Sequence, residues 1–258
     1  MQSNNIARCL REVLRLIPAD FTDSGLKTMA TAQLIEQQRQ STFAPHPMAA
    51  GGKKPKYLIV GLGNHDRPLT RHSVGMQVVD KLAGYLHAPW VKDQKNCVGF
   101  VAQTSISDNL DVVLLKPKMP MNVNGTSVAK TAQLFDIEPQ HIYLVHDDID
   151  KSLGKVAVKE LGSANGHNGV RSCMNSLRSD LMPRLKIGID RPPSKDEVSD
   201  YVLSEFSSSE QQIVNRAVDT CLVTIADHMA RRTGVELRKV LNLPQAESKT
   251  RPESKREM

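Results

Sequence analysis

The sequence of 258 residues predicts an α/β fold, with one domain spanning residues 55–242. Two observations support this prediction. Short apolar runs bounded by Gly, Pro, Ser and Asn alternate along this region with segments whose apolar residues recur at helical spacing. The hydrophobic fraction of 40%, with 15 Gly and 14 Pro, is that of a globular chain and excludes collagenous and wholly disordered classes.

The first half of the domain predicts four strands and two helices. Tyr57-Leu58-Ile59-Val60 is an apolar run ended by Gly61-Leu62-Gly63, as expected for a buried strand followed by a turn. Ser107-Asp108-Asn109 predicts a turn between two further strands. In chain order, the expected strands are 57–60, 98–102, 110–115 and 142–145, and the expected helices are 73–86 and 123–135.

The second half continues the same alternation. A strand at 155–159 precedes a loop rich in Gly, Ser and Asn, which runs from Gly162 to Gly169. The remaining elements are a helix at 170–177, a strand at 185–189 ended before Pro192-Pro193, and a long helix at 209–231 with Ile213 and Val223 among its apolar positions.

The two ends of the chain differ from the domain. Residues 1–54 are expected to form a flexible extension that begins with a short amphipathic helix containing arginines, a pattern typical of mitochondrial presequences. Acidic residues such as Glu12 favour an ordinary surface helix instead, so a mitochondrial and a cytoplasmic location both stay open. Starts at Met29 or Met48 would lack this helix. Residues 243–258 are charged, low in apolar content and expected to be disordered.

Charge and cysteine content narrow the class of protein. The chain has 34 Lys and Arg against 28 Asp and Glu, and this net charge of +6 fits a nucleic-acid partner. The four cysteines contain no CxxC pair, which argues against a zinc ribbon or a disulfide framework and favours a reducing compartment. No apolar run approaches the roughly 18–20 residues that span a bilayer, so a membrane protein is not expected.

Polar residues gather in four places at predicted strand ends and in glycine-containing loops. Open α/β sheets usually hold their sites there. The four places are Gly63-Asn64 with Thr70-Arg71-His72, Met121-Asn122, His146-Asp147-Asp148, and Gly166-His167-Asn168-Gly169.

Three chemistries compete for these residues. Gly61 and Gly63 begin a dinucleotide-binding pattern, but its third glycine position is Asp66. A metal site has enough ligands, namely His72, His146, Asp147, Asp148, Asp150 and His167, although no HxxxH or HExxH spacing occurs. A histidine base oriented by a carboxylate, with asparagine amides as donors, uses all four places. Taken singly, these residues also fit structural roles as helix caps or buried histidines.

In six stretches the sequence resembles the bacterial-type peptidyl-tRNA hydrolases over about residues 56–231. They are Leu58–Asn64, Thr70–Gly75, Lys116-Pro117 with Met121-Asn122 and Gly125, His146–Asp150, Gly166–Gly169 and Arg184–Ile189. The resemblance implies one cofactor-independent domain with a twisted mixed β-sheet flanked by helices. It also implies hydrolysis of the ester that joins a peptide to the 3′ ribose of tRNA.

The resemblance also assigns roles residue by residue. His72 looks like the catalytic base and Asp147 like the carboxylate that stabilises its basic form. Asn64 resembles the residue that distinguishes a blocked aminoacyl group from a free one. The substrate- and water-positioning residues are expected to be Asn122, Asn168 and the adjacent His167, and the tRNA phosphate contacts are expected to be Lys159, Lys186 and Arg184.

The chain departs from the family pattern at four positions. The loop His65–Leu69 is two residues shorter than usual and lacks a Tyr, which leaves tRNA choice open. Ser73 replaces an Asn and is expected to cap a helix or accept a hydrogen bond. Pro120 stands where an aromatic residue is usual, and Ala157 stands at a basic position of the phosphate clamp.

The sequence therefore predicts a monomeric peptidyl-tRNA hydrolase that needs no cofactor or metal and recycles tRNA from aborted translation. The main alternative is an RNA-binding protein that keeps the hydrolase fold without turnover. A metal-dependent phosphohydrolase is the third possibility, and chelator-sensitive activity would distinguish it.

Overall fold

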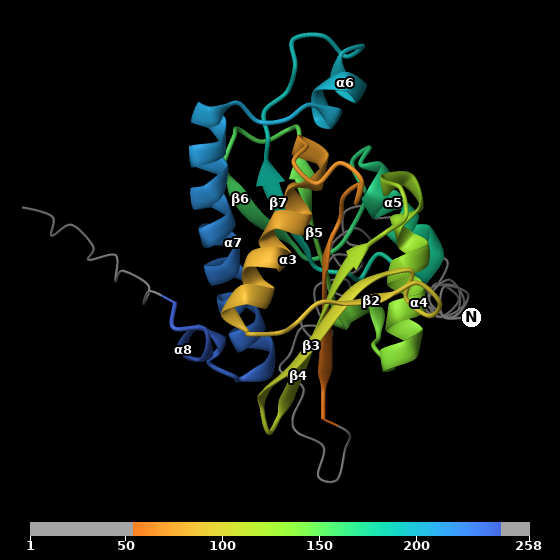
Figure 1. Ribbon diagram of the computed structural model, residues 1–258, viewed down its shortest axis with the longest axis vertical. Coiled ribbons are helices and arrows are strands. Elements are labelled where there is room, and N and C mark those ends of the chain that lie inside the picture. The colour runs from red at the N-terminus through yellow and green to blue at the C-terminus, as the bar shows by residue number, and fades with distance from the viewer. Residues whose placement is uncertain (1–53, 244–258) are drawn as a thin grey trace, which may run out of the picture. The chain divides into compact units, whose positions relative to one another are not determined.

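The computed structural model describes residues 54–243, which form a seven-stranded sheet with helices on both faces (Figure 1). The strands lie in the order β2-β3-β4-β1-β5-β7-β6. Their bounds are β1 Lys56–Gly61, β2 Val91–Asp93, β3 Gly99–Ser107, β4 Leu110–Pro117, β5 Ile142–Asp148, β6 Val156–Lys159 and β7 Arg184–Gly188. Neighbours among β4, β1, β5 and β7 pair in parallel, whereas the β2–β3, β3–β4 and β6–β7 pairs are antiparallel. The sheet is mixed, as predicted.

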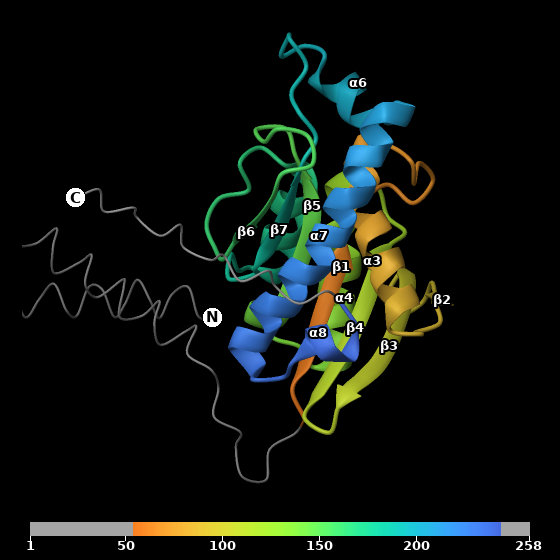
Figure 2. The ribbon, with the colours of Figure 1, turned by 90° about the vertical axis from the view of Figure 1, so that its left-hand side faces the viewer.

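Helices cover both faces of the sheet, as Figures 1 and 2 show from two directions. The helices are α3 Val74–Tyr85, α4 Asn124–Phe135, α5 Asn168–Leu177, α6 Val198–Leu203, α7 Ser208–Thr233 and α8 Leu237–Val240, with 3-10 turns η1 Arg71–Ser73, η2 Met121–Val123 and η3 Pro139–His141. The side chains of α3 and α7 pack on one face, and those of α4 and α5 pack on the other.

The sequence of the central strand β1 is continuously apolar because helices cover both of its faces. Tyr57 and Ile59 belong to the core under α3 and α7, whereas Leu58 and Val60 belong to the core under α4 and α5. Because successive side chains of a strand point to opposite faces, a strand covered on both sides has no solvent-facing position. Burying each large apolar side chain here contributes roughly 1.5–3 kcal/mol.

The predicted elements are present, with small shifts at their ends. The largest shift is at β3, which continues to Ser107. The shift that concerns the site is at β5, which continues to Asp148, so that His146 and Asp147 belong to the strand itself. Three elements, β2, α6 and α8, were not predicted from the sequence. These elements have three, six and four residues, too few for a periodic pattern to stand out.

The long helix α7 differs from its prediction at one apolar position. Ile213 is 38% exposed rather than part of the core, and its side chain lies beside Gly154. Val223 is partly buried against the core, as expected for this helix. A capping box starts α7: the Ser207 side chain accepts from the Glu210 amide, and the Glu210 carboxylate accepts from the Ser207 amide.

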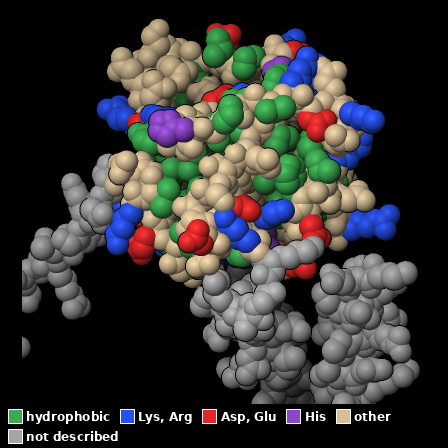
Figure 3. Space-filling model, turned by 60° about the horizontal axis from the view of Figure 1, so that its bottom comes forward, with side chains coloured by type: hydrophobic (Ala, Val, Ile, Leu, Met, Phe, Trp, Pro, Cys, Tyr) green, Lys and Arg blue, Asp and Glu red, His purple; other side chains and the backbone are tan. Residues whose placement is uncertain are grey.

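Three further expectations concern the ends of the chain, membrane spans and the positive charge. The N-terminal amphipathic helix and nearly all of the C-terminal tail lie outside the described residues. Among residues 54–243, no helix combines the length and apolarity that a membrane crossing requires. On the face shown in Figure 3, basic and acidic side chains are interspersed, so positive charge is not gathered into one large patch there.

Candidate active site

A pocket of about 690 Å³ opens beyond the carboxyl ends of the parallel strands. It brings all four predicted places together. Of the predicted site residues, it is lined by Asn64, His72, Asn122, Asp147, His167, Asn168 and Lys186, whereas Lys159 and Arg184 are not among its lining residues. Because the carboxyl ends of parallel strands meet at one edge of the sheet, segments distant in sequence converge there.

Two glycines allow this convergence. A Cβ on Gly75 would lie 2.2 Å from the carbonyl oxygen of Val145, so only glycine lets the start of α3 rest directly on β5. This close approach places η1, and therefore His72, beside the end of β5. Similarly, a Cβ on Gly125 would lie 2.1 Å from the carbonyl oxygen of Ser172, which sets the close packing of α4 on α5.

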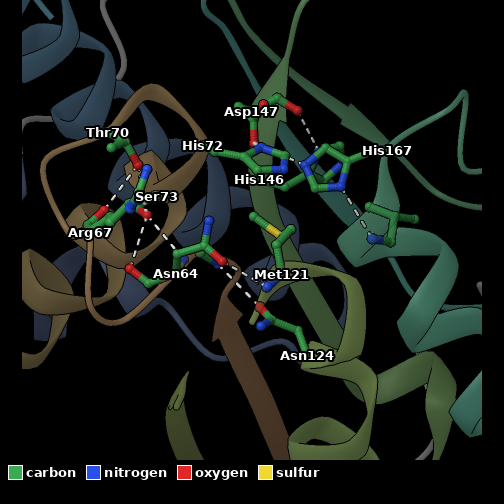
Figure 4. Close-up of polar contacts among 12 residues, drawn as sticks. Asn64, Arg67, Thr70, His72, Ser73, Met121, Asn124, His146, Asp147 and His167 are labelled. Carbon is green, nitrogen blue, oxygen red and sulfur yellow. Dashed lines mark hydrogen bonds and ion pairs between the residues drawn. The ribbon is translucent and has the colours of Figure 1, made fainter. Parts of the chain in front are cut away.

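Two histidines share one carboxylate oxygen at the centre of the pocket (Figure 4). His72 Nδ1 and His167 Nε2 each lie 2.9 Å from Asp147 Oδ1. Asp147 is buried in β5, and the two imidazole rings are 4.9 Å apart between centroids. The predicted pair of His72 and Asp147 is therefore close enough for a hydrogen bond, and His167 completes a cluster that the sequence analysis placed only beside the amides.

The hydrogen bonds indicate which nitrogens carry protons. His167 Nδ1 accepts from the amide of Val170 at 3.2 Å, so its Nε2 is the donor to Asp147. Both nitrogens of His167 are thus occupied. His72 donates through Nδ1, and its Nε2 makes no hydrogen bond within residues 54–243. A neutral His72 therefore presents a free lone pair, whereas His167 does not.

The Asp147 carboxyl group is held in its charged form. Burial alone would raise the pKa of Asp147, but the positive character and hydrogen bonds of His167 and His72 outweigh it. The resulting pKa lies well below the ordinary range of a carboxyl group. An ionised Asp147 is the form that orients a neutral imidazole and stabilises an imidazolium.

His146 lies beside this cluster and is neutral. It is 4% exposed, its Nδ1 donates to the backbone oxygen of Asp147, and its ring packs on His167 at 4.5 Å between centroids. Burial and the positive character of His167 lower the pKa of His146 well below its usual value. His146 therefore does not add a charge beside His167.

Three asparagine side chains also line the pocket. Asn64 Oδ1 accepts from the amide of Met121 at 2.8 Å, so the Nδ2 of Asn64 remains as a donor. Asn122 and Asn168 also line the pocket, and their side-chain amides have no hydrogen-bond partner within the described chain. Three amide groups are thus available to a bound molecule.

Asn124 is a site residue that the sequence analysis missed. Its Oδ1 accepts from Gly63 N at 3.2 Å, and its Nδ2 donates to the carbonyls of Met119 and Pro120 at 2.7 and 3.0 Å. The fully buried Asn124 side chain therefore ties the loop after β1 to the loop that carries Asn122. Its position in the Met-Asn-Val-Asn-Gly stretch at the start of a helix was the available signal.

Ser73 meets half of its expectation. It occupies the N-cap position of α3 but makes no side-chain cap. Instead, its Oγ accepts from the amide of Asn64 at 3.0 Å and thereby holds the loop after β1. In the shortened loop that follows, His65 lies on the ring of Phe100 at 4.7 Å between centroids. The effect of this loop on tRNA choice stays a prediction.

The three predicted phosphate contacts are neighbours on β6 and β7 but differ in accessibility. Lys186 pairs with Asp148 at 2.6 Å, and Lys159 donates to the carbonyl of Ser163 at 3.1 Å. Burial and the charges of Arg184 and Lys186 lower the pKa of Lys159. Such crowding of positive charge favours a bound anion.

Arg184 is buried, unlike the two lysines. It is 2% exposed, and its guanidinium donates to the carbonyls of Gly162 and Ser163. These bonds support the loop that leads to His167, and a contact between Arg184 and a tRNA phosphate stays a prediction.

The same cluster contains the side-chain types of a metal site. One ligand atom from each of His72, Asp147 and His167 lies within 4.8 Å of the others, which is close enough to surround an ion. However, both histidine nitrogens that face Asp147 act as hydrogen-bond donors in this arrangement, and a metal ligand must offer a lone pair. The donor set therefore fits protons better than a metal ion.

Comparison with known proteins gives the same family as the motifs. The family model described as peptidyl-tRNA hydrolase matches residues 58–250. The chain belongs to this family. The match starts two residues after the beginning of the 56–231 stretch in which the motifs lie, and it extends beyond the end of that stretch.

Relatives at the level of sequence and of structure support the assignment. A probable peptidyl-tRNA hydrolase of Mus musculus is 46% identical over 180 residues, which cover 69% of this chain and 87% of the relative. A peptidyl-tRNA hydrolase of Sulfurihydrogenibium is 37% identical over 172 residues, which cover 65% of this chain and 89% of the relative. The crystal structure of the Acinetobacter baumannii peptidyl-tRNA hydrolase superposes with a TM-score of 0.64 at 31% identity and covers 74% of this chain and 95% of that one.

Proposed function

We propose that this chain hydrolyses the ester between a peptide, or an N-blocked aminoacyl group, and the 3′ ribose of tRNA, with His72 as the general base. One observation carries the proposed mechanism. The bond between His72 Nδ1 and Asp147 Oδ1 leaves Nε2 as the free lone pair in a pocket that also offers unengaged amides.

In the first step, water attacks the ester carbonyl. His72 Nε2 takes one proton of the water as the new C–O bond forms, and the carbonyl π electrons move onto the oxygen. The imidazolium that results is stabilised by the ionised Asp147 through the Nδ1 bond. Because His167 is already occupied on both nitrogens, it steadies Asp147 rather than competing for this proton.

The tetrahedral intermediate carries a negative oxygen that needs donors. The free amide nitrogens of Asn64, Asn122 and Asn168 are the candidates in the pocket wall. When the intermediate collapses, the bond to the ribose oxygen breaks and the imidazolium returns its proton to that oxygen. The products are a free carboxylic acid and a tRNA with an intact 3′ hydroxyl.

The size of these contributions fits an ester substrate. A general base contributes typically about 10²–10⁴-fold, and one oxyanion donor contributes roughly 10²–10³-fold. An ester already has a good leaving group, so a positioned water, a base and amide donors are sufficient. The proposed base, its carboxylate and the amide donors all lie in residues 54–243 of a single chain, so the proposed chemistry needs no residue from a second copy, and we propose that the chain acts as a monomer.

The direct test is release of N-acetylated amino acid from acetyl-aminoacyl-tRNA by the parent protein, with and without a chelator. We expect cleavage that the chelator leaves unchanged, because the hydrogen-bonded cluster needs no ion. Activity that the chelator abolishes and zinc restores would contradict this mechanism. Binding of the tRNA without any cleavage would instead favour the RNA-binding alternative.

Alanine replacement of Lys159 or Lys186 is expected to weaken tRNA binding and flatten its dependence on salt. Each lost phosphate contact should reduce the slope of log K against log[salt] by about 0.7–0.9. Binding titrations from low to moderate salt measure this slope. The control is Lys239→Ala on α8, which removes the same charge from an exposed position outside the pocket lining. Lysine variants that keep the parent's affinity and slope would remove these residues from the tRNA contact.

A further inference from the structure

Arg71 precedes the proposed base in the Thr-Arg-His motif, yet the mechanism above gives it no role. Its side chain does not line the pocket, and the residue is only 6% exposed. A buried arginine is costly unless its guanidinium is well paired. Its partners therefore indicate what it does.

The Arg71 side chain is held by residues of α6, of α7 and of the segment that joins these two helices. Its Nη2 contacts both carboxylate oxygens of Glu210 at 2.9 and 2.8 Å, and its Nε donates to Ser204 Oγ at 3.2 Å. The guanidinium lies 4.3 Å from the ring centroid of Tyr201 and 4.8 Å from that of Phe206. The Arg71 backbone amide also donates to the Ser204 carbonyl at 2.9 Å.

These contacts matter because α6 forms one wall of the pocket without a core of its own. Val198, Val202 and Leu203 of α6 line the pocket, but none of the six residues of this helix is buried. Figures 1 and 2 show α6 beyond the end of the sheet, above α3 and the start of α7. Only Tyr201 and Val202 of this helix pack against the core, and both are partly buried, so the polar contacts of Arg71 add to a limited hydrophobic contact.

Tyr201 connects α6 to the rest of the site on two sides. Its hydroxyl donates to the carbonyl of Ile189 at 2.5 Å, just after β7, and its ring lies against Arg71. The three residues of η1 thus reach three different walls. Arg71 holds the α6 wall, His72 bonds to Asp147 of β5, and Ser73 holds the loop at Asn64.

We propose that Arg71 is a positioning residue that sets the α6 wall against the proposed base and thereby determines how tightly the acyl part of the substrate binds. Three of the four α6 residues that line the pocket, Val198, Val202 and Leu203, are apolar and the fourth is Ser199, a set that suits a peptidyl side chain better than a phosphate. His72 has its own anchor in Asp147, so the loss of Arg71 acts on binding more than on the chemical step.

The test compares kinetics of Arg71→Gln and Arg71→Lys on an acetyl-aminoacyl-tRNA with a bulky apolar side chain and on one with glycine. For Arg71→Gln, we expect KM to rise about tenfold on the bulky substrate, with kcat within about threefold of the parent, because uniform binding is lost. The rise should be smaller on the glycine substrate. Arg71→Lys keeps the charge without the planar guanidinium, and its KM on the bulky substrate should lie between those of the parent and Arg71→Gln.

A second variant series guards against misfolding of the Arg71 variants. Tyr201→Phe keeps the ring beside Arg71, whereas Tyr201→Leu removes both ring and hydroxyl, so Tyr201→Leu should raise KM more than Tyr201→Phe does. The matched control is Arg238→Gln on α8, outside the pocket lining. Arg238 is a partly buried arginine that also contacts its carboxylate partner, Asp227, and does so through two nitrogens. This substitution should lower thermal stability without changing KM.

The inference rests on the proposed hydrolase activity, and the experiment separates the two. Absence of cleavage by the parent would overturn the function itself. Normal parent activity with a fall in kcat at unchanged KM in Arg71→Gln would overturn only the role of α6. Two other results would assign the effect to general destabilisation. One is a rise of KM in Arg238→Gln equal to that in Arg71→Gln, and the other is an equal rise of KM on the bulky and glycine substrates in Arg71→Gln.

Discussion

Replacing His72 by alanine is expected to lower kcat by about 10²–10⁴-fold, the contribution typical of a general base, while tRNA affinity stays nearly unchanged. The physical reason is geometric. Only Nε2 of His72 is a free lone pair in the histidine pair that shares Asp147, because both nitrogens of His167 are engaged. Single-turnover release of N-acetyl amino acid, together with equilibrium binding of the same tRNA, measures the two quantities separately.

The matched control is His87→Asn, at an exposed position just after the end of α3 with a left-handed φ of 48° that Asn tolerates. This variant should retain the parent's kcat and KM. An equal loss of binding and turnover in His72→Ala would show that His72 holds the substrate and is not the base. Retained turnover would transfer the role of base to another group in the pocket.

Asp147→Asn is expected to lower kcat by roughly 10³–10⁴-fold, as for other histidine bases that lose their carboxylate. The neutral amide no longer stabilises the imidazolium. An amide nitrogen facing His72 would also force the Nδ1 lone pair toward it and place the proton on Nε2. Because His167 bonds to the same oxygen, the orientation of both rings depends on this one side chain.

The charge on Asp147 also makes a prediction for pH. Its folded-state pKa is depressed, so its stabilising effect is complete above the unfolded value of about 3.9 and is lost only as the pH falls through the lower folded value. Between about pH 5 and 9, titration of Asp147 should therefore contribute nothing to the activity profile. Acid unfolding of the parent and of Asp147→Asn, followed by circular dichroism, measures the stability difference.

Asp150→Asn serves as the control for the carboxylate. Asp150 stands three residues further along, and its side chain is 52% exposed in a pair with Arg191. This substitution removes a charge of the same sign from the same segment and should leave kcat within about twofold, since exposed ion pairs contribute little. A comparable fall in both variants would attribute the effect to net charge near the pocket.

Periodicity was sufficient for the order of the main elements because it is a local property. Four apolar residues followed by Gly61 predict a strand whatever lies beside it. The motif residues likewise predicted which side chains meet, since the carboxyl ends of β1 and β5 share an edge of the sheet. The short elements β2, α6 and α8 have no such pattern, because their positions depend on neighbours rather than on their own sequence.

The sequence by itself determined the α/β class, the family and the pairing of His72 with Asp147 as a candidate base and carboxylate. Tertiary structure alone decided that His167 shares that carboxylate, that Arg184 is buried and bonded to the carbonyls of Gly162 and Ser163, and that Arg71 joins η1 to α6. These contacts join side chains up to 139 positions apart. Local propensity carries no information about contacts between residues so far apart in the sequence, because these contacts form only when the two cores pack on opposite faces of the sheet.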